Sequence, residues 1–158
     1  MAGGCKMRQN DGYQHRRHNK TLLIVHLIFV TKYRKPVLIE QLSADVKQII
    51  FDTCKKKHWY IRCMETDKDH IHILLQYNPK DSITDIVSML KQTSTFYIWK
   101  HHMSFLKKHY WKEHTLWSNG FFACTVGNAC KNTVEHYIES QGLIMRVIKT
   151  DPKGSPFL

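Results

Sequence analysis

His70 and His72 stand two positions apart in a short apolar segment that is predicted to be a strand. Side chains alternate across a strand, so both imidazoles are expected on one face, with Ile71 and Ile73 on the other. If the isoleucines pack into a core, the two histidines lie on the open face of a sheet, close enough to hold one metal ion. Two surface histidines would give the same pattern, so a metal site is a hypothesis at this point.

Tyr137 and Gln141 are four positions apart in a predicted helix and therefore lie on one helical face, one turn from each other. A phenol with a pKa of about 10 is a poor nucleophile unaided. A metal that polarises a nearby phosphate reduces that handicap, and the amide oxygen of Gln141 could complete the metal's ligand shell. Taken alone, such a pair is more often a packed aromatic and a surface amide.

Hydrophobic periodicity predicts the elements that would position these residues. Strands are expected at 22–31, 58–65, 69–77 and 121–126, helices at 40–57, 82–103 and 129–142, and a loop at 104–119. The order β-α-β-β-α-β is the ferredoxin-like α+β pattern, an antiparallel sheet with helices on one face, here with an additional C-terminal helix that carries Tyr137. This fold hosts many activities, so function has to be argued from the site.

Charge indicates the class of partner. The chain carries 24 Lys and Arg against 13 Asp and Glu, a net charge of +11, which favours polyanions. The longest apolar run, 22–30, is interrupted by His26 and is too short to cross a bilayer, so nucleic acid is expected and a membrane is not. Five cysteines without a C-x-x-C pair favour a reducing compartment, and we expect a cytoplasmic protein.

Five short motifs together resemble one known family, the single-tyrosine HUH transposases of the smallest bacterial and archaeal insertion sequences. The resemblance covers about residues 20–142, with the motifs in the family's order and spacing. They are T-K-Y-R-K-P-V-L (31–38), T-D-K-D-H-I-H-I-L (66–74), L-W-S-N-G-F-F (116–122), T-V-G (125–127) and Y-I-E-S-Q (137–141). The resemblance implies a catalytic domain at 21–142. Outside it lie residues 1–20, which are polar and basic and are expected to form a flexible arm, and a C-terminal tail at 143–158.

The same resemblance implies roles for four residues. His70, His72 and Gln141 would bind Mg²⁺ or Mn²⁺, and Tyr137 would attack a phosphate of single-stranded DNA to form a 5′-phosphotyrosine and a free 3′-OH. The resemblance also implies that the protein works as a homodimer and recognises DNA hairpins at the ends of its insertion sequence. Imidazoles alone would favour zinc, copper or nickel, but DNA phosphate and water would supply the oxygens that magnesium prefers. The apolar segment 22–30 is one candidate edge for pairing between copies.

Two basic and aromatic segments are candidate DNA contacts, because cations beside aromatic rings suit phosphate contact and base stacking. One contains Lys32, Tyr33, Arg34 and Lys35; a charged loop is the alternative. The other could bind DNA or pack its tryptophans into the core, and it contains Lys107, Lys108, Tyr110, Trp111, Lys112 and Trp117.

Three other functions remain open at the level of sequence. A non-catalytic nucleic-acid-binding module would share the fold, since RNA-recognition domains use the same element order. A zinc hydrolase would use His70 and His72 without Tyr137. A host-adopted relative would process repeats instead of mobilising an element. Metal-dependent covalent capture of a single strand separates the first two from a transposase.

Overall fold

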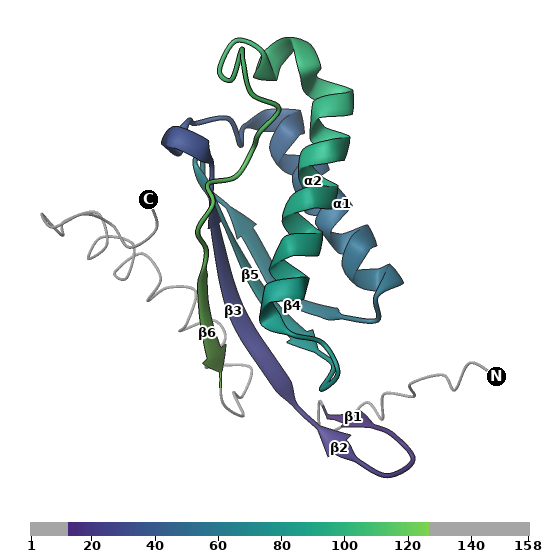
Figure 1. Ribbon diagram of the computed structural model, residues 1–158. Helices are drawn as coiled ribbons and strands as arrows, with labels where there is room; N and C mark the ends of the chain where they lie inside the picture. The colour runs from purple at the N-terminus through teal and green to yellow at the C-terminus, as the bar shows by residue number, and fades with distance from the viewer. Residues whose placement is uncertain (1–12, 127–158) are drawn as a thin grey trace, which may run out of the picture.

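The structure, a computed structural model, describes residues 13–126. It has a four-stranded antiparallel sheet with two long helices on one face, and a two-stranded hairpin near its N-terminal end (Figure 1). In chain order the elements are β1 (Gln14–His15), β2 (Lys20–Thr21), β3 (Leu23–Val30), the 3-10 turn η1 (Lys32–Arg34), α1 (Glu40–Lys56), β4 (Tyr60–Thr66), β5 (His70–Tyr77), α2 (Ile83–Leu106) and β6 (Phe122–Val126).

The main sheet has the strand order β4-β5-β3-β6, with every neighbouring pair antiparallel. This confirms the predicted β-α-β-β-α-β arrangement. The predicted last helix lies outside the described residues. One expectation is wrong: β3 is a central strand that pairs with both β5 and β6, so its backbone groups are already used and segment 22–30 offers no edge to a second copy.

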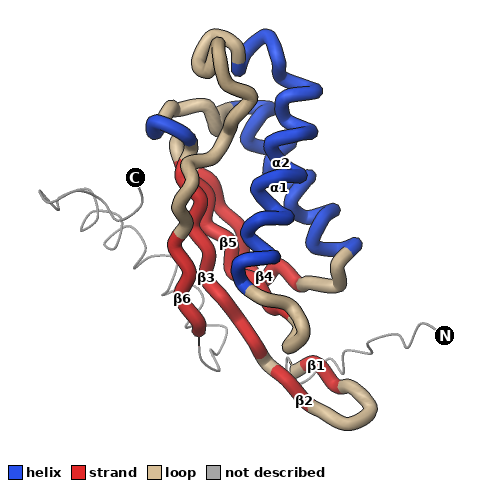
Figure 2. The backbone as a smooth tube through the Cα atoms, in the orientation of Figure 1, coloured by secondary structure: helices blue, strands red, loops and turns tan. Residues whose placement is uncertain are grey.

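The hydrophobic core lies between the sheet and the two helices, which cover the same face (Figure 2). Alternation along β3 and β5 sends every second side chain to this face, and the helices supply residues three or four positions apart. The most deeply buried members are Val25, Leu27, Phe29, Val37, Val46, Ile50, Ile71, Ile73, Leu75, Ile86, Leu90, Ile98, Leu106 and Leu116.

Helix α2 begins where the sequence predicts and ends later. Ser82 caps it, because the backbone N–H of Asp85 donates to the Ser82 hydroxyl (3.0 Å) and that hydroxyl donates to the Asp85 carboxylate (2.7 Å). The helix continues to Leu106, three residues beyond the predicted end, because Leu106 is fully buried and adds to its apolar face. Among the described residues, neither helix is both long and apolar enough to cross a membrane.

Residues 13–20 differ from the loose arm expected there. They form most of the β1–β2 hairpin, in which Gln14 pairs with Thr21 and His15 with Lys20. The Arg16 guanidinium donates to the side-chain oxygen of Asn78 (2.9 Å), which ties the hairpin to the end of β5. The basic side chains thus stand on an ordered turn.

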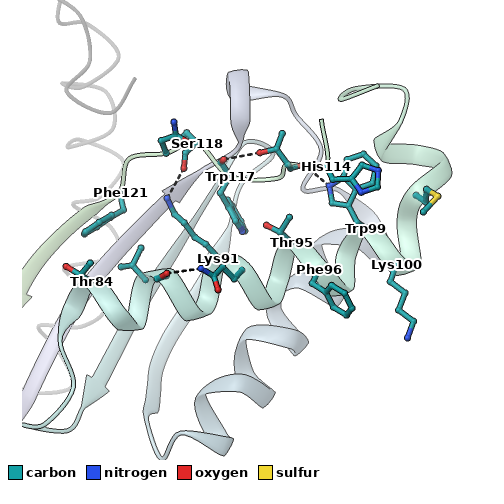
Figure 3. Close-up of a pocket in the computed structure, with 16 residues that line it drawn as sticks. Thr84, Lys91, Thr95, Phe96, Trp99, Lys100, His114, Trp117, Ser118 and Phe121 are labelled. Atoms are coloured by element: carbon teal, nitrogen blue, oxygen red, sulfur yellow. Dashed lines mark hydrogen bonds between the residues drawn. The ribbon is translucent and has the colours of Figure 1, made fainter. Parts of the chain in front are cut away.

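The segment between α2 and β6 is held against α2 by side-chain hydrogen bonds. The indole N–H of Trp117 donates to the hydroxyl of Ser94 (2.8 Å), and that of Trp99 donates to the carbonyl of Thr115 (2.8 Å). The Lys91 ammonium donates to the carbonyl of Ser118 (2.8 Å; Figure 3) and to that of Gly120 (2.7 Å). Residues that make these contacts line a cavity of about 860 Å³ on the helical side of the molecule. The same hydrogen bonds direct the chain into β6.

Lys91 is an unusual anchor because its ammonium is half-buried against the rings of Phe29 and Phe121. Burial lowers the pKa of Lys91 to about 8. The unfolded chain therefore binds this proton up to about pH 10.5, whereas the folded chain releases it at lower pH.

We expect this difference to appear in the pH dependence of stability. Between about pH 8 and pH 10.5 the unfolded state binds more protons at Lys91 than the folded state, so this residue's contribution to the free energy of unfolding rises with pH. Denaturant unfolding of the wild type and of Lys91→Met measures it, because other titrating groups cancel in the comparison. Parallel pH profiles for the two proteins would contradict this assignment.

Candidate active site

His70 and His72 occupy the face of β5 that points away from the helices. Ile71 and Ile73 lie on the opposite face and are fully buried in the core, as the alternation predicts. The two imidazole rings are neighbours, with centroids 4.9 Å apart and planes almost perpendicular. They are less open than expected, because His70 is buried and His72 is half-buried.

Asp69 fixes the orientation of His70. The Nδ1–H of His70 donates to Oδ1 of Asp69 at 2.7 Å, while the other carboxylate oxygen lies 3.4 Å from Nε of Arg34. Since Nδ1 is occupied by this hydrogen bond, the ring nitrogen left for a metal is Nε2. A carboxylate behind an imidazole is a common way to set the tautomer of a metal-binding histidine.

His26, on the neighbouring strand β3, holds the second imidazole. Its ring stacks on His72 with centroids 5.5 Å apart and an interplanar angle of 11°, and its Nε2 lies 3.3 Å from Nδ1 of His72. The register of β3 with β5 pairs Ile28 with His72, so His26 comes from the same face of the sheet, one side-chain step further along. In His72, as in His70, Nε2 is the nitrogen not used by these contacts.

Burial keeps the imidazole rings of His26 and His72 neutral. Burial lowers the pKa of His26 to about 4, and burial together with the nearby His70 and His26 lowers the pKa of His72 to about 4. Neutral imidazole is the form that binds a metal, so the chemistry of these donors fits a divalent cation.

Two imidazoles do not complete a metal site. Within residues 13–126, no cluster of three or more His, Cys, Asp or Glu side chains has a geometry that could hold a metal ion. Further ligands would have to come from substrate, from water or from outside this range. Tyr137 and Gln141 both lie outside the described residues.

The predicted DNA-contact residues 32–35 lie beside the histidines. They form the turn η1, directly after β3, and Arg34 of this turn pairs with Asp69. The Thr31 hydroxyl donates to the carbonyls of Lys35 (2.8 Å) and Asp69 (3.2 Å), which joins the turn to the start of β5. Arg34 is therefore engaged in the support of His70, whereas Tyr33 is exposed.

Two supporting residues were not predicted from the sequence. His26 stands out only as the single polar residue in an apolar run, and its partner was not foreseeable without the strand register. Asp69 precedes His70 directly, but nothing in the spacing indicates that its carboxylate turns back to the imidazole.

Comparison with known proteins establishes the family. Residues 19–141 match the family described as "Transposase IS200 like". The chain belongs to the IS200-like transposase family. Membership in this family implies a divalent metal.

Relatives at about 30% identity support the assignment over most of the chain. The transposase is 30% identical over 136 residues to the ISDra2 transposase TnpA of Deinococcus radiodurans, covering 86% of this chain and 91% of the relative. It is 31% identical over 118 residues to the transposase for insertion sequence element IS200 of Salmonella typhimurium, covering 73% and 74% of the two chains.

Two solved structures have the same fold. A crystal structure of a candidate transposase from Deinococcus radiodurans superposes with a TM-score of 0.66 at 29% identity, covering 80% of this chain and 96% of that one. A REP-associated tyrosine transposase bound to a REP hairpin superposes with a TM-score of 0.52 at 14% identity, covering 82% and 72% of the two chains. At that identity the second comparison concerns the fold alone.

The geometry around Asp69 leads to a prediction about His70 in the metal-free protein. Because a carboxylate can only accept, the neutral ring must carry its proton on Nδ1, the reverse of the tautomer usually favoured in water. ¹⁵N NMR at neutral pH should report the Nδ1–H form for His70 in the wild type and a shift towards Nε2–H in Asp69→Ala. Asp67→Ala, in the same turn, is the control. An Nε2–H tautomer in the wild type would contradict the proposed orientation.

Proposed function

We propose that this transposase cleaves and rejoins single-stranded DNA at the ends of an insertion sequence, with Tyr137 as its nucleophile. The phenolic oxygen attacks the scissile phosphorus, the bond to the 3′ oxygen breaks, and that oxygen leaves as a free 3′-OH after taking a proton. The protein is then joined to the 5′ phosphate as a phosphotyrosine. Reversal of the step rejoins DNA without an external energy source.

The observation that carries this proposal is the pair His70 and His72. Contacts with Asp69 and His26 orient the two rings and leave Nε2 of each for a ligand, and burial keeps His72 neutral. The family match supports the rest, because it extends to residue 141 and so includes Tyr137 and Gln141. We assign the catalytic domain to residues 21–142 on the same ground. A non-catalytic binding module would not need paired imidazoles supported by Asp69 and His26.

We assign the metal ligands as His70, His72 and Gln141, and the metal as Mg²⁺ or Mn²⁺. When bound, the ion would polarise the scissile phosphate. The chain's own contribution is orientation: Asp69 and His26 hold the two rings, and the neutral state of His72 leaves its lone pair available. Phosphate and water would supply the remaining oxygens.

We propose that the substrate is unpaired DNA next to a hairpin. The REP-associated relative was solved with a REP hairpin, and this chain has a net charge of +11. Because several phosphates would be neutralised, affinity should fall steeply with salt. A hairpin also presents an unpaired strand beside its stem, which an attack on single-stranded DNA requires.

We propose that two copies pair through the β6 edge of the main sheet. The other edge, β4, carries exposed Arg62 and Glu65 and a bulge between Ile61 and Cys63, features that protect an edge from pairing. Strand β6 has the uncharged sequence F-A-C-T-V and pairs only with β3 among the described residues. An unprotected edge of this kind suits an isologous strand pair between identical chains.

Catalysis is tested by comparing the amount of covalent adduct that the wild type and Tyr137→Phe form with a labelled single strand of DNA. This substitution removes only the hydroxyl, so folding and DNA affinity should be retained while adduct formation falls by at least about a thousandfold. Mass spectrometry of the digested wild-type adduct should place the nucleotide on Tyr137. A nucleotide on another residue, or an adduct in Tyr137→Phe, would refute the mechanism.

His70→Ala and His72→Ala are companion variants in the same assay. Each should retain DNA binding and lose Mg²⁺-dependent cleavage, whereas Gln141→Ala should be milder because water can replace one neutral ligand. If the wild type binds DNA and forms no adduct with Mg²⁺ or Mn²⁺, the non-catalytic module becomes the better explanation.

The dimer edge is tested by Thr125→Lys. Thr125 is exposed on β6, and a lysine there would bring like charges together in paired copies and weaken dimerisation several-fold. Light scattering at micromolar concentration measures the change. Glu65→Lys, which raises the charge of the β4 edge by two units where Thr125→Lys adds one, should leave the dimer intact; if it dissociates the dimer instead, the assignment of the edge is wrong.

A further inference from the structure

Two exposed aromatic rings, far apart in the sequence, belong to two turns at the end of the sheet that carries His70. Trp111 is 76% exposed and Tyr33 is 65% exposed, in a chain whose other described tryptophans are buried. The Tyr33 hydroxyl donates to the carboxylate of Glu113 (3.2 Å), and Glu113 belongs to the same tight turn as Trp111. Single exposed rings are common on protein surfaces, so what distinguishes these two is their surroundings.

The backbone beneath these rings is fixed. The buried Tyr110 donates its hydroxyl to the carbonyl of Lys32 (3.0 Å), and the Lys32 N–H donates to the carbonyl of Leu116 (2.8 Å). Tyr33 and Arg34 adopt positive φ angles of 58° and 51°, which non-glycine residues avoid unless the surroundings impose them. The turn η1 and the 110–113 turn are thus held together in a conformation that presents Tyr33 to solvent.

Each ring has a cation close to it. The ammonium of Lys112 lies 4.5 Å from the centroid of the Trp111 ring, and that of Lys32 lies 5.4 Å from that of Tyr33. Exposed cation–π pairs are too weak to explain why the rings remain in water. Protein-docking surfaces are typically poor in lysine, whereas aromatic rings flanked by cations are typical of surfaces that bind single-stranded nucleic acid.

The position of the rings relates them to the chemistry. Arg34, next to Tyr33 in the chain, contacts Asp69, which in turn orients His70. Both turns lie at the end of the sheet where β3 ends and β5 begins, which is the end that carries His70 (Figure 1). A DNA strand with a phosphate at the histidines would therefore pass these rings within a few nucleotides.

We infer that Tyr33 and Trp111 form an aromatic platform on which unpaired bases next to the scissile phosphate stack, while Lys32 and Lys112 contact the adjoining phosphates. The inference rests on the proposed function, since it assigns the platform to the single-stranded substrate of the same site. It joins the two basic and aromatic segments of the sequence, 32–35 and 107–117, into one surface.

The test compares DNA binding by Trp111→Ala and the wild type, both in the Tyr137→Phe background so that cleavage does not interfere. The probes are a fluorescein-labelled dT12 and the same oligonucleotide with all bases removed, measured by anisotropy. Loss of one stacking ring should weaken dT12 binding by about tenfold, and Tyr33→Leu should act in the same direction. Neither variant should change binding of the abasic strand, which retains the phosphates.

Two further measurements sharpen the result. Phe96→Ala removes an aromatic ring that is also 65% exposed but belongs to α2, outside the platform, and it should bind dT12 like the parent. Because Trp59, Trp99 and Trp117 are buried, quenching of tryptophan fluorescence by dT12 should come from Trp111 and disappear in Trp111→Ala.

Several results would overturn the inference. Unchanged dT12 affinity in Trp111→Ala, or an equal loss with the intact and the abasic strand, would show that bases do not stack there. Neither result bears on Tyr137, which the adduct assay tests separately. A parent protein that binds neither strand would overturn the platform and the proposed single-stranded substrate together.

Discussion

The antiparallel pairing of β3 with β5 is the constraint on which the site depends. Its register places Ile28 opposite His72 and Val30 opposite His70. Strict alternation then sends the isoleucines of β5 to the helices and its histidines to the other face. A shift by one residue would bury the imidazoles in the core and expose the isoleucines, so the fully buried Ile71 and Ile73 specify the position of the two histidines.

The histidines are held by groups from outside β5. His26 reaches His72 from the central strand, and Asp69 reaches His70 from the turn before it. Burial lowers the pKa of His26 and of His72 to about 4 and so keeps both rings neutral at neutral pH. The same low-polarity surroundings thus hold the His26 and His72 rings in place and keep them in the neutral form.

The long connection between α2 and β6 has two parts with different surroundings. Trp117 and Trp99 are buried and bonded to Ser94 and Thr115, which stabilises the connection against α2. Trp111, in the middle of the same connection, remains in water beside η1. The described tryptophans therefore divide into three buried ones and the exposed Trp111.

Much of the fold was predictable because its periodicities are strong. The four main strands, both long helices, the Ser82 cap and the shared face of His70 and His72 all follow from local spacing, and the five motifs indicated the family that the comparisons establish. The sequence alone also named Tyr137 and Gln141, which lie outside the described residues. It did not reveal the ordered hairpin at 13–21, the central position of β3, the supports at His26 and Asp69, or the proximity of Tyr33 to the 110–113 turn. Each of these depends on contacts between residues distant in the chain or on the orientation of one side chain. Local spacing carries no information about strand order or loop contacts. Only the packing of the whole sheet and its loops therefore decides them.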